Sequence, residues 1–230
     1  MSVFAIGDLH LSFGSNKPMD VFGESWENHT DRLREGFAGV SENDVVVLAG
    51  DSSWGMSMKE ALPDFSFIAS LPGKKLVLKG NHDYWWETAS KTKRILSENG
   101  IEGIDIIHNN AFLHESTAIC GTRGWFYEED AEGSHGKKIY NRELGRLKTS
   151  LDAARALQAS RIICFLHYPP ICDGYECEEI TKMLSEAGVD ECCYGHLHGY
   201  GHVHGFNGVH EGVLYKLISA DYLKFTPIAL

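Results

Sequence analysis

The stretch from Leu76 to Asp83 reads Leu-Val-Leu-Lys-Gly-Asn-His-Asp, a short apolar run that ends in polar residues. Five other short runs rich in apolar and β-branched residues also end at a glycine or a histidine. Such runs, bounded by turn residues, are typical of buried strands. The six expected strands are residues 3–7, 45–50, 76–80, 104–108, 162–167 and 191–195.

Amphipathic segments alternate with these runs, and we expect helices over residues 31–40, 91–99 and 141–159. In the last of them, Leu144, Leu147 and Leu151 recur at spacings of three and four, which places them on one helical face. The alternation of strands and helices predicts an α/β sandwich. Near the end of the chain, residues 201–206 and 213–219 are predicted as two strands of a hairpin that turns at Asn207-Gly208.

The composition is that of an ordinary globular chain, with 230 residues of which 43% are apolar and 23% charged. Since no linker, internal repeat or low-complexity tract interrupts it, we expect one domain over residues 1–230. A chain of this length buries about 70% of its unfolded surface, so folding does not require disulfides or a structural metal. Any metal site must therefore be argued from its chemistry.

The formal net charge of −11 argues against general nucleic-acid binding, because nonspecific affinity depends on cations that neutralise phosphates. The first eight residues lack the basic start of a signal peptide, and no apolar run approaches the ~20 residues of a membrane-spanning helix. Six irregularly spaced cysteines favour reduced thiols, with a cysteine zinc site as the weaker alternative. We expect a cytoplasmic protein with no membrane partner.

Residue types that bind metals stand at the ends of five expected strands. They are Asp8, His10, Asp51, Asn81, His82, His167, His196 and His198. Open α/β sheets bind ligands beyond the carboxyl ends of their strands, so residues far apart in sequence converge there. A pair of first-row divalent cations requires nitrogen and oxygen ligands, including one carboxylate that bridges both ions. The pattern therefore predicts a metal centre at this edge.

Four motifs and one histidine follow each other in a particular order. They are Asp8-Leu9-His10, Gly50-Asp51, Gly80-Asn81-His82-Asp83, His167 and Gly195-His196-Leu197-His198. In this order they resemble the calcineurin-like metallophosphoesterase superfamily, and in particular its small phosphohydrolases and phosphodiesterases. The motifs span residues 8–198, which is most of the chain. The resemblance implies an α/β fold, built as a four-layer α/β/β/α sandwich with mixed sheets and a dinuclear metal centre at one edge.

The resemblance also implies two groups of metal ligands and one bridge between them. The groups are Asp8, His10 and His198 for one ion, Asn81, His167 and His196 for the other, and Asp51 as the bridge. Each residue has a structural interpretation as well. A lone histidine at a strand end, such as His167, is more often hydrogen-bonded structure than a ligand, and Asp51 can cap a helix instead. Membership in an ordered set favours ligation.

Two further residues of the third motif are candidates for catalysis. In this family's motif His82 is not a ligand, so it can protonate the leaving oxygen or hold the phosphate. Asp83 either orients that imidazole or stabilises a local turn. The two roles of Asp83 are equally compatible with the sequence.

The implied reaction is hydrolysis of a small phosphate ester by attack of metal-bound hydroxide, with two divalent ions per chain. We expect manganese, and iron, zinc, cobalt or nickel suit the same ligands. The Asp-Arg-Gly extension and the Arg-Gly-Asn-His-Glu segment of protein phosphatases are missing, since the chain has Gly50-Asp51-Ser52-Ser53-Trp54 and Lys79-Gly80-Asn81-His82-Asp83. Without an arginine clamp for a dianion, a diester is the expected substrate. A phosphomonoesterase and a non-catalytic protein-binding scaffold are the alternatives.

Weaker signals surround the motifs. Trp54, Trp85 and Trp86 either stack on a substrate ring or pack beneath the loops. Residues 128–138 are predicted as a polar surface excursion, either a lid over the metals or a solvated loop. His202 and His204 follow the complete ligand set and are expected to be structural or to support the ligands.

Overall fold

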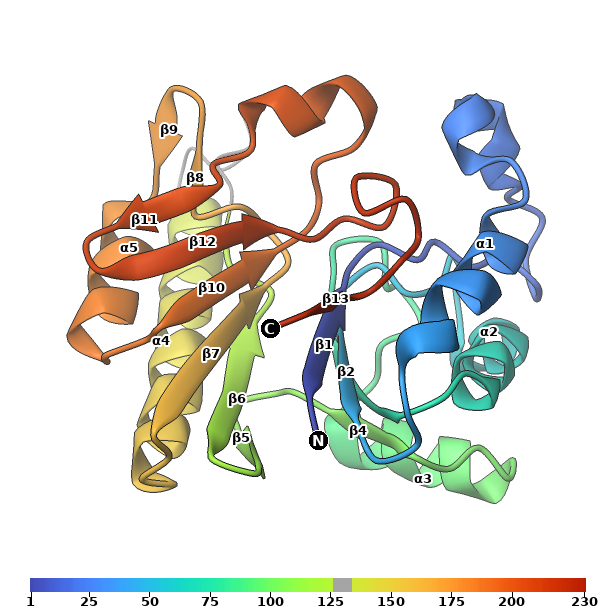
Figure 1. Cartoon of the computed structure of the whole chain (residues 1–230), viewed down its shortest axis with the longest axis horizontal. Helices are drawn as coiled ribbons and strands as arrows, with labels where there is room; N and C mark the ends of the chain where they lie inside the picture. Colours follow the sequence, from blue (N-terminus) through green and yellow to red (C-terminus); the bar gives the residue numbers. More distant parts are fainter. Residues whose placement is uncertain (126–133) are drawn as a thin grey trace.

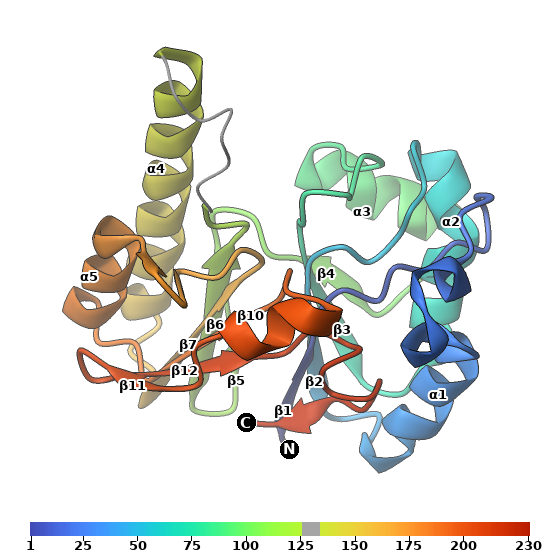
Figure 2. The same ribbon diagram turned by 90° about the horizontal axis from the view of Figure 1, so that it is seen from above.

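Two β-sheets pack face to face in the middle of the molecule, and helices cover the outer face of each sheet (Figure 1, Figure 2). This computed structural model describes residues 1–125 and 134–230. Both sheets combine parallel and antiparallel pairs, so they are mixed. The α/β/β/α sandwich with mixed sheets that the resemblance implied is therefore confirmed.

The first sheet has the strand order β13-β1-β2-β3-β4. Its strands are β1 (Val3–Ile6), β2 (Val45–Ala49), β3 (Lys74–Leu78), β4 (Ile104–Ile106) and β13 (Ile228–Ala229). The strands β1 to β4 run parallel, and β13 joins β1 in the antiparallel direction. All five residues of β2 are buried, because a parallel strand in this position is covered on both faces.

Three helices cover the outer face of this sheet. They are α1 (His29–Gly36), α2 (Met58–Ser70) and α3 (Ala89–Glu98). Leu33 of α1, Phe65 of α2 and Leu96 of α3 share one buried apolar cluster with Val46 and Val77 of the sheet. Burial of such side chains contributes about 1.5–3 kcal/mol each, which attaches the helices to the sheet.

The second sheet has the strand order β11-β12-β10-β7-β6-β5. Its strands are β5 (Ala111–His114), β6 (Thr117–Thr122), β7 (Arg161–Leu166), β10 (Glu191–Tyr194), β11 (Gly208–His210) and β12 (Val213–Leu217). The four central strands run parallel, and the two edge strands β5 and β11 are antiparallel to their neighbours. The short strands β8 (Ile171–Cys172) and β9 (Tyr175–Glu176) form a separate hairpin.

Two helices, α4 (Ser134–Ala156) and α5 (Glu178–Glu186), cover the outer face of the second sheet. Leu147 and Leu151 of α4 and Leu184 of α5 are buried in the cluster that they form with this sheet. A third apolar cluster lies between the sheets, where Val47 of β2 and Phe165 of β7 are both fully buried. The two sheets are thus held together by apolar contacts and present their strand ends at a common edge.

Short 3₁₀ helices complete the chain: η1 (Met19–Phe22), η2 (Glu24–Trp26), η3 (Phe37–Gly39) and η5 (Gly199–His204). The six strands predicted from residues 3 to 195 are confirmed with ends that differ by one or two residues. The strand predicted over residues 201–206 is wrong, since η5 covers most of this segment. The sequence analysis did not predict helices α2 and α5, nor the strands β5, β6, β8, β9, β11 and β13.

The hairpin near the end of the chain also differs from its prediction. Strands β11 and β12 are joined at Glu211-Gly212 and not at Asn207-Gly208. Glu211 and Gly212 have φ angles of 48° and 83°, the left-handed backbone that a tight hairpin turn requires. Asn207 precedes the hairpin, where its Oδ1 accepts a hydrogen bond from the Leu217 N–H at 2.9 Å.

The predicted surface excursion over residues 128–138 has two parts in the structure. Residues 128–133 lie outside the described residues, whereas residues 134–138 form the first turn of α4. Helix α4 therefore begins seven residues before the expected start at 141, and it ends at Ala156.

The last residues of the chain return to the first strand, so that both termini lie close together (Figure 1). Phe225 in this return segment is fully buried. Its ring meets the Trp26 ring edge-on at a centroid distance of 5.3 Å, and the Arg32 guanidinium lies 4.4 Å from its ring centroid. Phe225 thus fixes the return segment and η2 to α1.

We predict that Phe225→Ala lowers the free energy of unfolding by about 3–5 kcal/mol, because it leaves a cavity among Trp26, Arg32 and the return segment. Urea denaturation measures the change. Tyr200→Ala is the control, since 83% of Tyr200 is exposed and the effect of its removal should stay within about 0.5 kcal/mol. Equal unfolding free energies for the two variants would contradict the prediction.

Candidate metal centre

The predicted ligands converge where the parallel strands of both sheets end. Asp8 and His10 follow β1, Asp51 follows β2 and Asn81 follows β3, while His167 follows β7 and His196 and His198 follow β10. Four of them, Asp8, His10, Asp51 and His196, have φ angles between 47° and 73°. Backbone of this kind is costly outside glycine and gathers at functional sites. The strained turns direct the polar side chains to one place.

Two motif glycines leave room for the carboxylates. A Cβ atom at Gly80 would overlap Oδ1 and the backbone N of Asp51, and one at Gly195 would overlap Oδ2 of Asp8. The glycine before Asn81 and the glycine before His196 are therefore required by close packing around the two aspartates.

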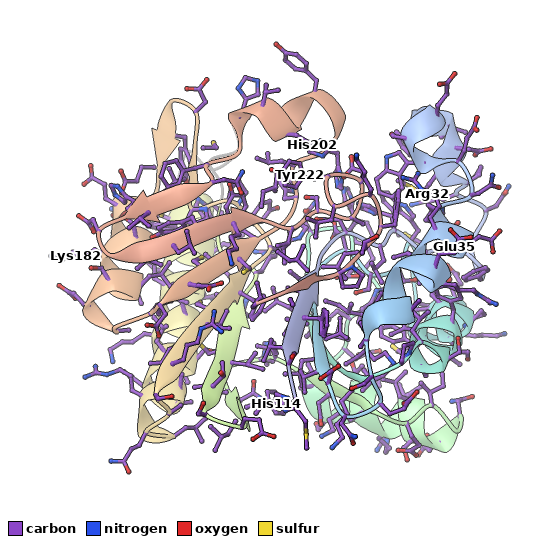
Figure 3. The ribbon with its side chains drawn as sticks, viewed as in Figure 1. Arg32, Glu35, His114, Lys182, His202 and Tyr222 are labelled. Carbon is purple, nitrogen blue, oxygen red and sulfur yellow. The ribbon has the colours of Figure 1, made fainter. Side chains whose placement is uncertain are left out.

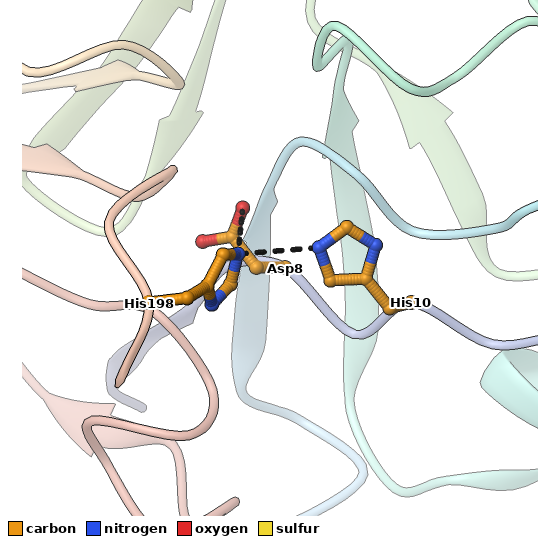
Figure 4. Close-up of side chains that lie close together, drawn as sticks. All are labelled: Asp8, His10 and His198. Atoms are coloured by element: carbon orange, nitrogen blue, oxygen red, sulfur yellow. Dashed lines mark hydrogen bonds and ion pairs between the residues drawn. The ribbon is translucent and has the colours of Figure 1, made fainter. Parts of the chain in front are cut away.

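The first cluster consists of Asp8, His10 and His198 (Figure 4). Nε2 of His198 lies 3.2 Å from Nε2 of His10 and 3.8 Å from Oδ1 of Asp8. Oδ1 of Asp8 is buried and has no hydrogen-bond partner among the described residues, while Oδ2 accepts a hydrogen bond from the His196 N–H. An unpaired buried carboxylate oxygen beside two imidazole nitrogens is a donor set that suits a divalent cation.

The second cluster consists of Asp51, His167 and Asn81, with Asp8 alongside. Nδ1 of His167 lies 3.1 Å from the Ala49 carbonyl, which can only accept, so Nδ1 carries the proton. The other nitrogen, Nε2, therefore presents its lone pair to Oδ1 of Asn81 at 2.6 Å and to Oδ2 of Asp51 at 3.5 Å. Three acceptor atoms therefore face each other: Nε2 of His167, Oδ1 of Asn81 and Oδ2 of Asp51. A cation between them would provide each with a partner.

Asp51 lies between the two clusters. Its Oδ2 is 3.9 Å from Nε2 of His10 and 3.5 Å from Nε2 of His167, while Oδ1 accepts a hydrogen bond from the His82 N–H at 2.8 Å. The ring of His196, the remaining predicted ligand, lies 5.1 Å from the His167 ring between centroids. The structure thus brings all seven predicted ligands to one region, and the donor set fits a pair of divalent ions.

Burial controls the ionisation of this cluster. It raises the pKa of Asp8 to about 7 and that of Asp51 to about 6, and it lowers the pKa of His167 and of His196 to about 3. Neutral imidazoles are the form that binds metals, and a divalent ion would stabilise the ionised carboxylates. A divalent ion would therefore take the place of the protons that burial favours on Asp8 and Asp51.

The contacts of Asp83 favour its turn-stabilising role. Its buried carboxylate accepts hydrogen bonds from the N–H groups of Gly80 at 2.7 Å, Asp51 at 2.9 Å and Ser52 at 3.0 Å, and from Nε1 of Trp85 at 2.9 Å. None of the hydrogen bonds found in the described ranges joins this carboxylate to the His82 ring. Asp83 thus ties the loop after β2 to the loop after β3.

A cavity of about 420 Å³ opens over the cluster. Its lining residues include His10, Asp51, Trp54, His82, Trp26, His196 and His198. The His82 ring lies 4.6 Å from the Trp54 ring and 6.0 Å from the His10 ring between centroids, so it faces the same space as the ligands. His82 therefore faces the cavity beside the candidate ligands.

Of the three tryptophans near the motifs, Trp85 packs beneath the loops, whereas Trp54 and Trp86 line cavities. The Trp54 ring stacks on the His10 ring at 4.9 Å, with Lys17 4.7 Å from its centroid, and Trp85 is buried with its Nε1 on Asp83. The Trp86 ring lies 5.2 Å from the Trp85 ring between centroids. Trp86 lines a second cavity, which is described below. The stacking contact with Trp54 restricts the orientation of the His10 ring.

Asp221 is a residue of the site that the sequence analysis missed. Its carboxylate accepts hydrogen bonds from Nδ1 of His198 at 2.9 Å and from the Gly199 N–H at 3.0 Å, and Nε2 of His202 lies 3.1 Å away. Figure 3 shows His202 beside Tyr222, whose ring is 5.2 Å distant. Burial acts to raise the pKa of Asp221, but these hydrogen bonds outweigh burial and hold that pKa well below its usual range.

Asp221 thus engages Nδ1 of His198, so that Nε2 of the same ring faces the cluster. His202 contacts the other oxygen of Asp221. His204 lies apart, with Nδ1 3.5 Å from the exposed Asp173. The signal that points to Asp221 is its place two residues after the predicted strand 213–219, at the same sheet edge as the ligands.

The chain belongs to the calcineurin-like phosphoesterase family, whose sequence pattern matches residues 1–200. The protein is accordingly a hydrolase of phosphate esters, and the family and the Asp/His clusters indicate divalent metal binding. None of the curated proteins matches it. No helix within residues 1–125 and 134–230 has both the length and the apolar character needed to span a membrane.

Solved structures with the same fold are distant in sequence. A protein of unknown function from Aquifex aeolicus, AQ665, is 15% identical with a TM-score of 0.53, covering 99% of this chain and 95% of that one. The phosphopantetheinyl hydrolase of Mycobacterium tuberculosis is 14% identical with a TM-score of 0.55, covering 100% and 95%. TT1561 of Thermus thermophilus is 10% identical with a TM-score of 0.54, covering 85% and 81%. These likenesses show a shared fold.

We predict that Asp221→Asn lowers metal affinity about 10–100-fold, because the amide no longer orients the His198 ring through a charged hydrogen bond. Isothermal titration of the metal-free protein with Mn²⁺ measures the affinity. Glu176→Gln is the matched control, since Glu176 holds His210 at 3.0 Å on a surface outside the cluster. Equal affinities for both variants would show that Asp221 does not support a ligand.

Proposed function

We propose that this phosphoesterase hydrolyses a phosphodiester with two divalent cations. The supporting observation is the position of Asp51, one of whose carboxylate oxygens lies within 4 Å of imidazole nitrogens from both ligand clusters. The proposed ligands are Asp8, His10 and His198 for one ion, Asn81, His167 and His196 for the other, and Asp51 for both. When bound, such a pair of ions lowers the pKa of a shared water and neutralises phosphoryl charge.

The residues around the ions have separate roles in this proposal. His82 lines the cavity while its backbone N–H holds Asp51, so its ring is placed to hold the phosphate or to protonate the leaving oxygen. Asp83 is a positioning residue, because it joins the backbone of the loops that carry Asp51 and Asn81.

The charge of the cavity favours a diester. Among the described residues that line it there is no lysine or arginine, so the metals alone would neutralise the substrate. A diester monoanion needs less neutralisation than a monoester dianion, for which a bidentate arginine clamp is the usual partner. The apolar lining by Met19, Phe22 and Trp26 suits the organic group of such an ester.

The proposal includes manganese as the metal and the cytoplasm as the compartment. The nitrogen and oxygen ligands accept manganese, and iron, zinc, cobalt and nickel as well. All six cysteines are free thiols, of which five are buried, which suits a reducing compartment. The organisation of residues 1–230 as one domain stays a prediction.

We predict manganese-dependent turnover of bis-p-nitrophenyl phosphate that falls by about 100-fold or more in Asp51→Asn and in chelated wild-type protein. Loss of a bridging ligand should cost at least as much as loss of a residue that only supports a ligand. Release of p-nitrophenol measures the rate, with the exposed Asp152→Asn on α4 as the control.

Three results would redirect this proposal. Faster turnover of p-nitrophenyl phosphate than of the diester would identify a phosphomonoesterase. Metal binding without turnover of either ester would favour a scaffold. Wild-type turnover by Asp51→Asn would remove the bridging role of that carboxylate.

We predict that His82→Ala keeps its metal content and loses about 10²–10⁴-fold in rate on a diester with a phenol leaving group. The loss should be smaller for a p-nitrophenol leaving group, which needs less protonation. Metal analysis and initial rates on the two diesters measure both effects. His114→Ala is the control, because His114 lies at the opposite edge of the sheets (Figure 3). Equal losses on both diesters would exclude proton donation by His82.

A further inference from the structure

A second cavity of about 360 Å³ lies at the same strand ends as the candidate metal centre, and none of the residues described for its lining belongs to the first cavity. Its lining residues come from the ends of β3, β4 and β6 and from α3 and α4. Figure 2 shows that α3 and α4 belong to opposite outer layers of the sandwich. The Arg123 carbonyl in this wall accepts a hydrogen bond from the His167 N–H at 3.0 Å. Lys79, also in the wall, precedes Asn81 by two residues.

The cavity is rich in positive charge on a chain whose net charge is −11. Three cations and two carboxylates line it: Lys79, Arg123, Arg146, Glu87 and Glu143. The Glu87 carboxylate pairs with Lys91 at 2.8 Å, which leaves Glu143 alone against three cations. The pKa of His108 in the same wall is lowered by burial and by Arg146. A concave wall with excess charge of one sign concentrates ions of the other sign.

Glu143 holds the two guanidinium groups in place. It is 2% exposed, and its Oε2 accepts a hydrogen bond from Oγ1 of Thr122 at 3.0 Å. Its Oε1 pairs with Arg146 and lies 3.7 Å from Nη2 of Arg123. Each guanidinium has five N–H donors, so most donors of the pair remain for another acceptor. The side chains of Arg123 and Arg146 are 24% and 43% exposed, so a solute can reach them.

We propose that this cavity binds a phosphate group. Two arginines converge on one buried carboxylate oxygen, so two guanidinium groups lie close together, and guanidinium groups are the side chains that bind phosphate oxygens in pairs of hydrogen bonds. Trp86, Ala89 and Ile107 form an apolar wall beside the cations, which suits the organic part of a phosphorylated molecule. A single carboxylate does not neutralise three cations, so internal ion pairing alone leaves the cluster with surplus positive charge. The bound phosphate is either a second phosphate of the substrate or a separate molecule that affects the enzyme.

The test is calorimetric titration of the manganese-loaded 230-residue chain with inorganic phosphate. We expect a binding event that Arg146→Gln weakens at least tenfold and that remains in Arg155→Gln, a control on the exposed face of the same helix. Arg123→Gln gives a second, independent variant. Phosphate binding that neither substitution changes would overturn the proposal. Binding is measured without turnover, so failure of the proposed diesterase activity is a separate result.

Kinetics separate the two sources of the phosphate. If it belongs to the substrate, Arg146→Gln should raise the KM at least tenfold for a nucleoside 5′-p-nitrophenyl diester that carries a 3′-phosphate. The same diester without the 3′-phosphate should be unaffected. If it is a separate molecule, added phosphate should change turnover of bis-p-nitrophenyl phosphate in the wild type and in Arg155→Gln at concentrations at least tenfold lower than in Arg146→Gln, where only the proposed metals remain to bind it. Either pattern supports the site. Both patterns are read from diester turnover and so rest on the proposed function, whereas the calorimetric titration does not.

Discussion

Two carboxylates, Asp8 and Asp51, are buried at the edge where both sheets end, and much of the surrounding structure follows from the cost of burying them. An isolated carboxylate in such a place would take up a proton, as the raised pKa values of both groups indicate. Backbone N–H groups of His196 and His82 bind one oxygen of each, and histidines surround the other. Motif glycines are required beside them, because any Cβ there would occupy the space of the carboxylate.

A second buried carboxylate, Asp83, explains how loops from different strands stay in register. It accepts hydrogen bonds from backbone N–H groups of the loop after β2 and of the loop after β3. The loops that carry Asp51 and Asn81 are therefore held together. Asp221 acts similarly on the other sheet, where it connects His198, His202 and Gly199. The ligands thus rest on a framework of charge-assisted hydrogen bonds, which are stronger and more directional than neutral ones.

The two cavities at the strand ends differ in charge. The cavity over the ligands has histidine, aspartate and apolar walls, whereas the second cavity contains Lys79, Arg123 and Arg146. A net charge of −11 conceals this difference, because net charge averages over the whole surface. Charge that matters for a small anion is local, and it depends on which side chains the fold places in one concave wall.

The sequence by itself determined the α/β class, six strands and the seven candidate ligands, because apolar runs and the motifs at their ends are local patterns. Only the tertiary structure decided that residues 201–204 belong to η5 and not to a strand, since the pairing of β11 with β12 and the contact of His202 with Asp221 are long-range. Three other elements were also missed for local reasons. Strand β6 contains Gly121, helix α2 contains Pro63, and helix α5 has only nine residues, so none of them shows a clear strand or helix pattern. Asp221 and the cluster of Arg123, Glu143 and Arg146 also required the fold, because residues on separate elements have no common spacing along the chain.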